Sequence, residues 1–259
     1  ALVDWNAPLP QEQKADKKLT DPGNYHLVDL RSAEEYAAGH IPNAINIAAR
    51  GRLETWVGIM IPWEANLVLI GSDPELTEAL FRLNSVVYKG QILRMTNWQK
   101  AGLPINQTSP IEPAVLYAQM QKGEAPVIVD VRLATEWVGL RIGKVLNLPL
   151  SHLAELSSQL EKDQPLVAVC NSAYRSSMAI GVLERQGFTL AKSLAGGSEA
   201  WINAGLPVYE GVKSGATSTA IAKRQIPLPE RISVEDLDRM RMDLPGTFTL
   251  VDIRPPEHF

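Results

Sequence analysis

The stretch LVDLRSAEEYAAGHIPNAINIA, residues 27–48, recurs in altered form as IVDVRLATEWVGLRIGKVLNLP at residues 128–149. Each copy opens with an apolar run, typical of a buried strand, that ends in an aspartate and an arginine two residues apart. A constant offset of 101 residues holds the copies in register and pairs Glu35 with Glu136. Self-similarity at a fixed period indicates a repeated structural unit, so the chain is predicted to contain the same fold twice.

The similarity continues beyond these stretches and begins a third time. NLVLIGS at 66–72 matches PLVAVCN at 165–171, and NWQKAGLPI at 97–105 matches AWINAGLPV at 200–208. A third opening, LVDIR at 250–254, stands close to the last residue of the sequence. We therefore predict a first repeat at 1–108, a second repeat at 109–212, a linker at 213–230 and the start of a truncated third unit at 231–259.

Short apolar, β-rich runs alternate with helical stretches in each repeat. In the second repeat the predicted strands are Val127–Val131, Leu166–Val169 and a short one near Lys192–Leu194. The predicted helices are Glu112–Lys122, His152–Glu161 and Arg175–Gln186. This alternation favours an α/β fold in which a parallel β-sheet carries helices on both faces.

The composition excludes several classes of protein. With 45% hydrophobic and 21% charged residues, the chain is expected to form a packed core rather than remain disordered. A net charge of −4 with dispersed Lys and Arg argues against a nucleic-acid partner, and no apolar run is long enough for a membrane span. A single cysteine cannot form an intrachain disulfide, which fits a cytoplasmic protein. The four histidines are too dispersed to predict a metal site.

The single cysteine stands in VAVCNSAYRSS, residues 167–177, where an apolar strand gives way to a polar loop and a predicted helix. The carboxyl ends of parallel strands line the ligand crevice of open α/β sheets, and a helix N-terminus favours an anion. A Cys170 thiol placed there, with Arg175 following four intervening residues later, is expected to ionise and act as a nucleophile. Cysteine is also a common core residue, but the polar residues after Cys170 favour the reactive interpretation.

Several motifs together make the chain resemble tandem rhodaneses, which are sulfurtransferases. They are the Asp-x-Arg strand ends, GHIPNAINI at 39–47, the loop CNSAYRSS at 170–177 and the tail LAGGSEAWINAGLPV at 194–208. The resemblance spans nearly all of residues 20–210 and implies tandem rhodanese-like domains. It also implies that the loop cysteine takes a sulfane sulfur from a donor, becomes a persulfide and passes the outer sulfur to a thiophilic acceptor.

Carried over to this chain, the resemblance makes Cys170 the nucleophile and persulfide carrier, and Arg175 the residue that attracts an anionic donor. The implied donor is thiosulfate or a low-molecular-weight persulfide, and the implied acceptor is cyanide or a thiol. No cofactor is implied, because the protein itself carries the sulfur. Main-chain N–H groups and hydroxyls of the loop would bind the substrate, and the residues concerned are Asn171, Ser172, Ala173, Tyr174, Ser176 and Ser177.

The length of the loop separates two chemistries. The related dual-specificity phosphatases have one residue more between Cys and Arg, and typically a His before the Cys. Here four residues intervene and Val169 precedes Cys170, so the smaller cradle suits one sulfur atom better than a phosphate. Ala173 stands where rhodanese loops of this length often have Gly, which implies either an altered loop shape or a right-handed conformation at that position.

The first repeat lacks the nucleophile. Gly71 occupies the position of Cys170, and two acidic residues near the loop, Asp73 and Glu75, would repel an anionic donor. We therefore predict a degenerate rhodanese-like domain that packs against the active one.

Two further polar features are interpreted as structural. Asp130 and Arg132 form a pair that recurs as Asp29 and Arg31 in the repeat without a nucleophile. His40 has no histidine counterpart in the second repeat. Neither feature is therefore expected to take part in the chemistry.

Two kinds of function fit this site. The first is an enzyme, a sulfurtransferase that works through a Cys170 persulfide. The second is a persulfide-carrier or interaction module that serves a fused or bound partner protein, with phosphatase activity a distant third. The loop sequence and the order of the repeats resemble the rhodanese portion of fusions with a metallo-β-lactamase-fold enzyme, although this chain has no H-x-H-x-D-H metal motif.

Overall fold

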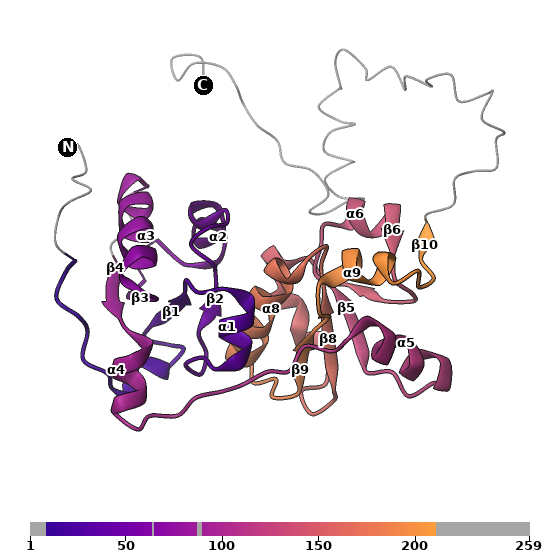
Figure 1. Cartoon of the computed structure of the whole chain (residues 1–259), viewed down its shortest axis with the longest axis horizontal. Coiled ribbons are helices and arrows are strands. Elements are labelled where there is room, and N and C mark those ends of the chain that lie inside the picture. Colours follow the sequence, from indigo (N-terminus) through magenta and orange to yellow (C-terminus); the bar gives the residue numbers. More distant parts are fainter. Residues whose placement is uncertain (1–8, 64, 87–89, 211–259) are drawn as a thin grey trace, which may run out of the picture. The chain divides into compact units, whose positions relative to one another are not determined.

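The computed structural model describes residues 9–63, 65–86 and 90–210, which include most of both repeats (Figure 1). Two four-stranded parallel sheets form the framework, one in each repeat. The first has the order β2-β1-β3-β4 and the second the order β7-β5-β8-β9, so equivalent strands occupy equivalent places. The duplication and the α/β class read from the sequence are confirmed. The predicted linker at 213–230 and third unit at 231–259 lie outside the described residues.

The strands of the first sheet are β1 (His26–Asp29), β2 (Ile45–Asn46), β3 (Leu67–Ile70) and β4 (Gly90–Leu93). Those of the second sheet are β5 (Val127–Asp130), β7 (Leu146–Asn147), β8 (Leu166–Val169) and β9 (Ala191–Ser193). A separate antiparallel pair joins β6 (Leu140–Arg141) to β10 (Tyr209–Glu210). All four residues of β3 and of β8 are buried, as expected for central strands that are covered on both faces.

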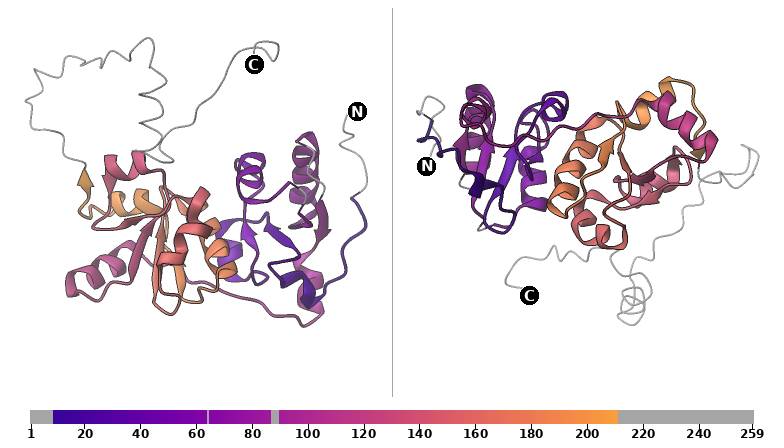
Figure 2. Two further views of the ribbon diagram at one scale, coloured as in Figure 1. Left: turned by 180° about the vertical axis from the view of Figure 1, so that it is seen from behind. Right: turned by 90° about the horizontal axis from the view of Figure 1, so that it is seen from below.

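Helices cover both faces of each sheet (Figures 1 and 2). Those of the first repeat are α1 (Ala33–Ala38), α2 (Leu53–Met60), α3 (Asp73–Ser85) and α4 (Met95–Lys100), after a 3-10 turn at Lys17–Thr20. Those of the second repeat are α5 (Pro113–Lys122), α6 (Ala134–Gly139), α7 (Leu153–Leu156), α8 (Ala173–Arg185) and α9 (Gly197–Asn203). Within the described ranges, no helix combines the length and the apolar character that crossing a membrane requires.

One predicted helix is interrupted. The helix expected at His152–Glu161 consists of a 3-10 turn at Leu150–His152, the short α7 and a second 3-10 turn at Ser157–Gln159. The hydroxyls of Ser157 and Ser158 donate to main-chain carbonyls three residues earlier, at 3.1 and 2.7 Å. Such hydrogen bonds compete with the main-chain hydrogen bonds of a regular helix. They do not change the spacing of apolar residues, from which the helix was predicted.

The Asp-x-Arg motif that opens each repeat forms the same ion pair in both. Arg31 pairs with Asp29 at 2.6 Å, and Arg132 pairs with Asp130 at the same distance. Each arginine also donates to a main-chain carbonyl eight residues later, which ties the strand end to the end of the following helix. The Asp–Arg pair also forms in the repeat that lacks a cysteine, which supports a structural role, and Arg132 in addition donates to Oδ1 of Asn171, next to Cys170, at 3.1 Å.

Helix α8 lies between the two repeats and packs on both (Figures 1 and 2). It contacts β8 and β9 in its own repeat, and β2 and α1 in the first. Gly181 permits the close approach, because a Cβ there would lie 2.7 Å from the Cα of Ile45. Glu184 on α8 lies 3.0 Å from His40 Nε2 and accepts the N–H of Asn43 at 3.3 Å. His40 therefore has the structural role that the sequence indicated.

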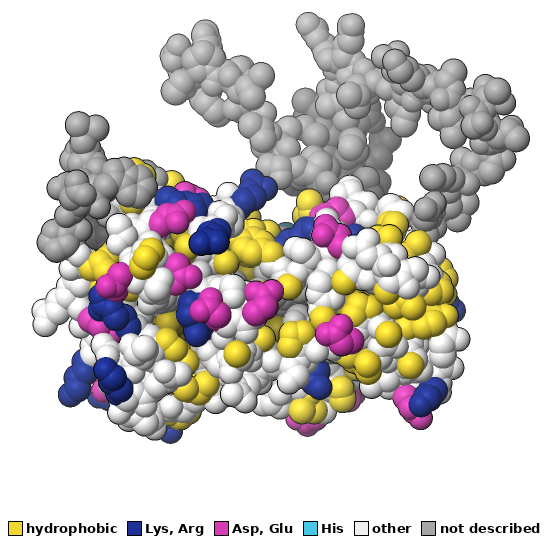
Figure 3. All heavy atoms as spheres, in the orientation of Figure 1, with side chains coloured by type: hydrophobic (Ala, Val, Ile, Leu, Met, Phe, Trp, Pro, Cys, Tyr) yellow, Lys and Arg dark blue, Asp and Glu magenta, His cyan; other side chains and the backbone are white. Residues whose placement is uncertain are grey.

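The surface carries charges of both signs. On the face shown in Figure 3, Lys and Arg side chains lie among Asp and Glu side chains, separated by neutral and apolar surface. Among the described residues, no group of three or more His, Cys, Asp or Glu side chains is arranged to hold a metal ion.

Candidate functional site

Cys170 follows β8, a central strand of the second sheet, and precedes α8. This is the carboxyl end of a parallel sheet, where α/β proteins place their ligands. Helix α8 begins at Ala173, two residues earlier than predicted, with Ser172 as its N-cap. Ala173 is therefore right-handed, which is one of the two conformations that the sequence left open. The cysteine stands beside the first turn of a helix, where unpaired N–H groups and the helix dipole favour negative charge.

The sulfur atom of Cys170 has three close polar neighbours. The amide of Ser176 donates to Sγ at 3.3 Å, and the hydroxyl of the same residue lies 3.5 Å from Sγ. The carbonyl oxygen of Ser172 contacts Sγ as the acceptor of the thiol proton. Cys170 is only 1% exposed. The structure thus shows a covered thiol with one carbonyl and one amide directed at it.

The predicted ring of amides around the sulfur is therefore only partly present. In the described loop, Ser176 supplies the one N–H that bonds to Sγ, and the Ser172 carbonyl faces the sulfur. A rotation of the peptide between Ser172 and Ala173 would exchange that carbonyl for an N–H group. The hydroxyl of Ser177 donates to the carbonyl of Tyr174 at 2.8 Å and so is engaged within the helix.

Helix α9 holds the loop backbone in place. Its amides at Ser198 and Glu199 donate to the carbonyl oxygens of Cys170 and Asn171 at 2.8 and 2.9 Å. Gly197 has a φ of +62° and sits against the loop, where a Cβ would lie 2.6 Å from the carbonyl carbon of Asn171. Only glycine combines this conformation with this approach. Gly197 of the tail therefore allows α9 to pack against the loop that carries Cys170, a contact that the sequence did not reveal.

The guanidinium of Arg175 is paired with Glu136 on α6. Its two terminal nitrogens donate to the two carboxylate oxygens at 2.7 and 2.8 Å, which is a bidentate ion pair. The hydrogen bond from Arg175 lowers the pKa of Glu136 to about 2, and the carboxylate in turn raises the pKa of Arg175. Glu136 also accepts from Nδ2 of Asn171 at 3.3 Å. The sequence marked Glu136 as a repeated position but gave no sign of its partners.

Tyr174 extends from the loop toward the first repeat. Its phenol lies against Gly51, where a Cβ atom would overlap the ring. Burial raises the pKa of Tyr174, and the amide of Arg52 partly opposes that rise.

A cavity of about 790 Å³ opens beside the loop, and its walls come from both repeats. Ser172, Tyr174 and Arg175, which were all predicted to belong to the site, line it on one side. Arg52, Trp56 and Ile59 line it from the first repeat. Cys170 is buried and does not line this cavity itself; Ser172, whose carbonyl contacts its sulfur, does.

The first repeat fills its equivalent loop with its own carboxylate. Glu75 accepts from the N–H of Ser72 at 2.7 Å and from its hydroxyl at 2.8 Å. A Cβ at Gly71, the position of the missing nucleophile, would lie 3.2 Å from a Glu75 carboxylate oxygen. Asp73, the other acid near this loop, is paired with Arg94 at 2.7 Å. A side chain at position 71 would therefore stand in close contact with Glu75.

Known proteins resemble both repeats. The model of the family described as rhodanese-like domain matches residues 12–75 and 112–204. A sulfurtransferase of Allochromatium vinosum is 32% identical over 98 residues, which cover 38% of this chain and 92% of that protein. The thiosulfate sulfurtransferase GlpE of Shewanella oneidensis is 36% identical over 83 residues, which cover 32% of this chain and 82% of that protein. Among solved structures, a rhodanese-related protein from Thermoplasma volcanium is 31% identical with a TM-score of 0.36, covering 39% of this chain and 96% of its own.

Proposed function

Because the chain belongs to the rhodanese-like domain family, we propose that it is a sulfurtransferase whose second repeat carries out the reaction and whose first repeat is a degenerate copy. Cys170 is the proposed nucleophile and persulfide carrier, and Arg175 the cation beside it. The proposed substrate-binding residues are those of the loop: Asn171, Ser172, Ala173, Tyr174, Ser176 and Ser177.

The position of the Cys170 sulfur is the observation that carries the proposal. It lies at the carboxyl end of a central strand, beside the first turn of α8, and accepts the amide hydrogen of Ser176. The amide and the helix dipole both stabilise a negative charge at this point, on the cysteine thiolate first and on its persulfide afterwards. The two anions need the same surroundings, so one loop serves both halves of a transfer cycle.

The reaction balances without any cofactor. The thiol loses its proton to solvent, and the thiolate of Cys170 attacks the outer sulfur of thiosulfate or of a persulfide. A new S–S bond forms to Cys170, the S–S bond of the donor breaks, and sulfite or a thiolate departs with the electron pair. In the second half of the transfer cycle, a thiolate or cyanide attacks the outer sulfur of the Cys170 persulfide. Cys170 then leaves as the thiolate, and the product is a new persulfide or thiocyanate.

The Ser172 carbonyl must move for this cycle to run. It covers the sulfur of Cys170 in the thiol form and would repel a thiolate or a persulfide. Rotation of the Ser172–Ala173 peptide removes the carbonyl and brings the Ala173 N–H toward the sulfur.

Intact-mass measurement tests the proposal directly. The protein is incubated with thiosulfate or with glutathione persulfide, freed of donor and weighed, and thiocyanate formation from thiosulfate and cyanide is followed in parallel. We expect a mass gain of one sulfur atom, located at Cys170, and turnover that Cys170→Ser abolishes. A mass gain without turnover would favour the carrier module, and hydrolysis of an aryl phosphate without any mass gain would overturn the proposal.

A second variant tests whether turnover needs the thiol to be in this loop or only needs a thiol somewhere in the chain. Ser158 is exposed and lies outside the loop, so Cys170→Ser combined with Ser158→Cys keeps one thiol in the chain but moves it away. This double variant is expected to show no turnover. Equal turnover in the double variant and the wild type would mean that the loop contributes nothing to the reaction.

A further inference from the structure

The cavity beside the loop is far larger than the smallest sulfur donors. Its volume is about 790 Å³, within the range of pockets that hold drug-sized molecules, roughly 300–1,000 Å³. Thiosulfate and cyanide have only a handful of heavy atoms and would occupy a small part of it. A volume of this size beside the proposed nucleophile is suited to a donor that carries its sulfur on a larger molecule.

The two arginines of this cavity differ in their partners. Arg175 is bound on both terminal nitrogens by Glu136, so that its charge is largely neutralised before any substrate arrives. Arg52, at the N-cap of α2, is exposed and lines the same cavity. Within the described ranges its guanidinium takes part in no hydrogen bond or ion pair. The available cation at the mouth of the site therefore comes from the repeat that lacks a nucleophile.

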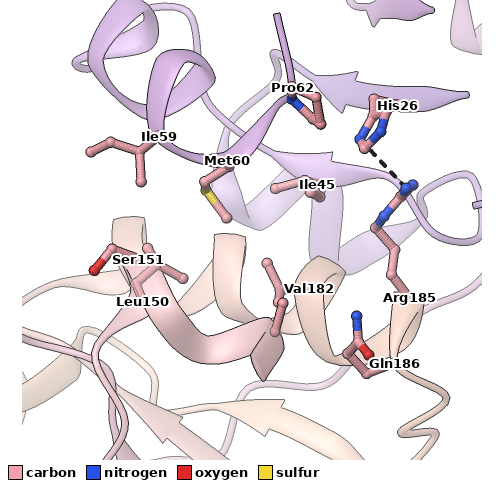
Figure 4. A pocket seen from close by; sticks show the side chains of 11 residues that line it. His26, Ile45, Ile59, Met60, Pro62, Leu150, Ser151, Val182, Arg185 and Gln186 are labelled. Carbon is pink, nitrogen blue, oxygen red and sulfur yellow. Dashed lines mark hydrogen bonds between the residues drawn. The ribbon is translucent and has the colours of Figure 1, made fainter. Parts of the chain in front are cut away.

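Apolar side chains also line the cavity. Trp56 and Ile59 stand on the same helix, α2, and Leu150 belongs to the second repeat. Ile59, Leu150 and Ser151 also line a neighbouring pocket of about 320 Å³, shown in Figure 4. There Ile59 lies on one side of the space and Leu150 with Ser151 on the other. The two hollows therefore share these three residues.

Arg185 at the far end of the Figure 4 pocket is already engaged. Its guanidinium donates to the carbonyls of Pro22, Tyr25 and Asn43 at 2.7, 3.2 and 3.4 Å. It also lies 3.4 Å from Nδ1 of His26 (Figure 4). These contacts anchor α8 to the first repeat, so Arg185 has fewer free donors for a ligand than Arg52 has.

From these observations, which rest on the proposed sulfurtransferase function, we infer that Arg52 is a specificity-determining residue of the site. It binds a carboxylate of a peptide-sized persulfide, whose body lies along Trp56 and Ile59 while its outer sulfur reaches Cys170. The first repeat thus selects the molecule that carries the sulfur, and the second repeat carries out the transfer. Thiosulfate is also an anion but has no body to lie along Trp56 and Ile59, so it depends on Arg52 less than the larger donor does.

Steady-state kinetics with two donors test this inference. Arg52→Ala, Arg52→Lys and the wild type are compared with glutathione persulfide and with thiosulfate. Loss of one charge-assisted hydrogen bond is expected to raise KM for glutathione persulfide about tenfold in Arg52→Ala, with little change in kcat. KM for thiosulfate should change less than about twofold, and Arg52→Lys should recover part of the loss. The matched control is Arg50→Ala, an exposed arginine two residues away that does not line the cavity.

An esterified donor shows whether the carboxylate is what Arg52 binds. The dimethyl ester of glutathione persulfide keeps the body and the sulfur but has no carboxylate charge. Wild type and Arg52→Ala should have the same KM for this ester. An unchanged KM for glutathione persulfide in Arg52→Ala, or an equal rise for both donors, would overturn the inference.

The results with the two donors also distinguish a failure of this inference from a failure of the proposed function. If the wild type turns over thiosulfate through Cys170 but does not use glutathione persulfide, the function stands and the role of Arg52 is refuted. If neither donor places a sulfur on Cys170, the proposed function fails and the inference fails with it. Thermal unfolding of each variant verifies that the differences in KM do not come from a loss of fold.

Discussion

The phenol ring of Tyr174 lies directly over the backbone of Gly51. A Cβ atom at Gly51 would overlap the phenol oxygen and would lie 2.6 Å from ring carbon Cε2. Tyr174 lies in the first turn of α8, close after the cysteine, and Gly51 belongs to the other repeat. The lack of a side chain at Gly51 therefore allows Tyr174 to pack against the first repeat.

Gly51→Ala is expected to displace the Tyr174 ring, which is too rigid to yield by a small rotation. Overpacking of this kind costs about 1–3 kcal/mol of unfolding free energy, and the shift of the loop should lower sulfur transfer from every donor. Gly58→Ala is the control, because a Cβ there meets nothing within 4 Å and the substitution favours the helix by about 0.5–1 kcal/mol. Urea unfolding and thiocyanate formation measure both effects. Equal stability of the two variants would contradict the contact.

Gly197→Ala should disturb the loop from the opposite side. The new Cβ would meet the main chain of Asn171, which cannot move without shifting Cys170, and alanine is also strained at the φ of +62°. Gly205→Ala separates the two causes, because Gly205 has a similar φ of +67° with open space around it. We expect both variants to lose stability, and only Gly197→Ala to lose most of its activity. A similar loss of activity in both would assign the effect to backbone strain alone.

Glu136→Gln should release Arg175. The loss of a partly exposed bidentate pair is expected to cost about 1 kcal/mol of unfolding free energy. The freed guanidinium should attract an anionic donor more strongly, so KM for thiosulfate should fall. The pKa of Glu136 is about 2 in the folded protein, below its usual value of 4.5, so its contribution is complete above pH 4.5 and is lost as pH falls toward 2. Unfolding curves of both proteins should therefore converge at low pH, whereas a constant difference would refute the ion pair.

His26 should make the protein less stable in mild acid. Burial, with a contribution from the Arg185 charge, lowers its pKa from 6.5 to about 4. The unfolded chain takes up a proton near pH 6.5 but the folded chain does not, so stability falls as pH drops from 6.5 toward 4. In His26→Gln this fall should be smaller. Melting temperatures between pH 7 and 4 measure it, with His152→Gln, an exposed histidine, as the control. Parallel curves for wild type and His26→Gln would contradict this assignment.

Much of the fold could be predicted from the repeat. The strand Leu166–Val169 has the predicted bounds, and the helix predicted from Glu112 begins one residue later at Pro113. Apolar runs bounded by turn residues carry a strong local signal, because a central strand must be apolar on both faces. The broken helix after Leu150 was not predictable in the same way, since serine hydroxyls that bond to carbonyls leave the apolar pattern unchanged.

The site was predictable only in part. The sequence could place Cys170 and Arg175 close together because only four residues separate them in the chain. The partner of Arg175 is Glu136, which is 39 residues away, and the direction of the Ser172 carbonyl depends on a single peptide rotation. Arg52 lies in the other repeat and reaches the cavity only through the packing of α2 beside the loop. Such long-range relationships follow from tertiary structure, which a repeat pattern does not encode.

The packing of α8 has a consequence for whether either repeat can stand alone. One continuous hydrophobic cluster includes Val28 and Ile45 from the first repeat together with Met178 and Leu183 from α8. Each repeat therefore covers apolar side chains of the other, and removing one repeat would expose them to water. The first repeat, which has Gly71 at the position of Cys170, therefore contributes to the packing of the helix that follows the cysteine.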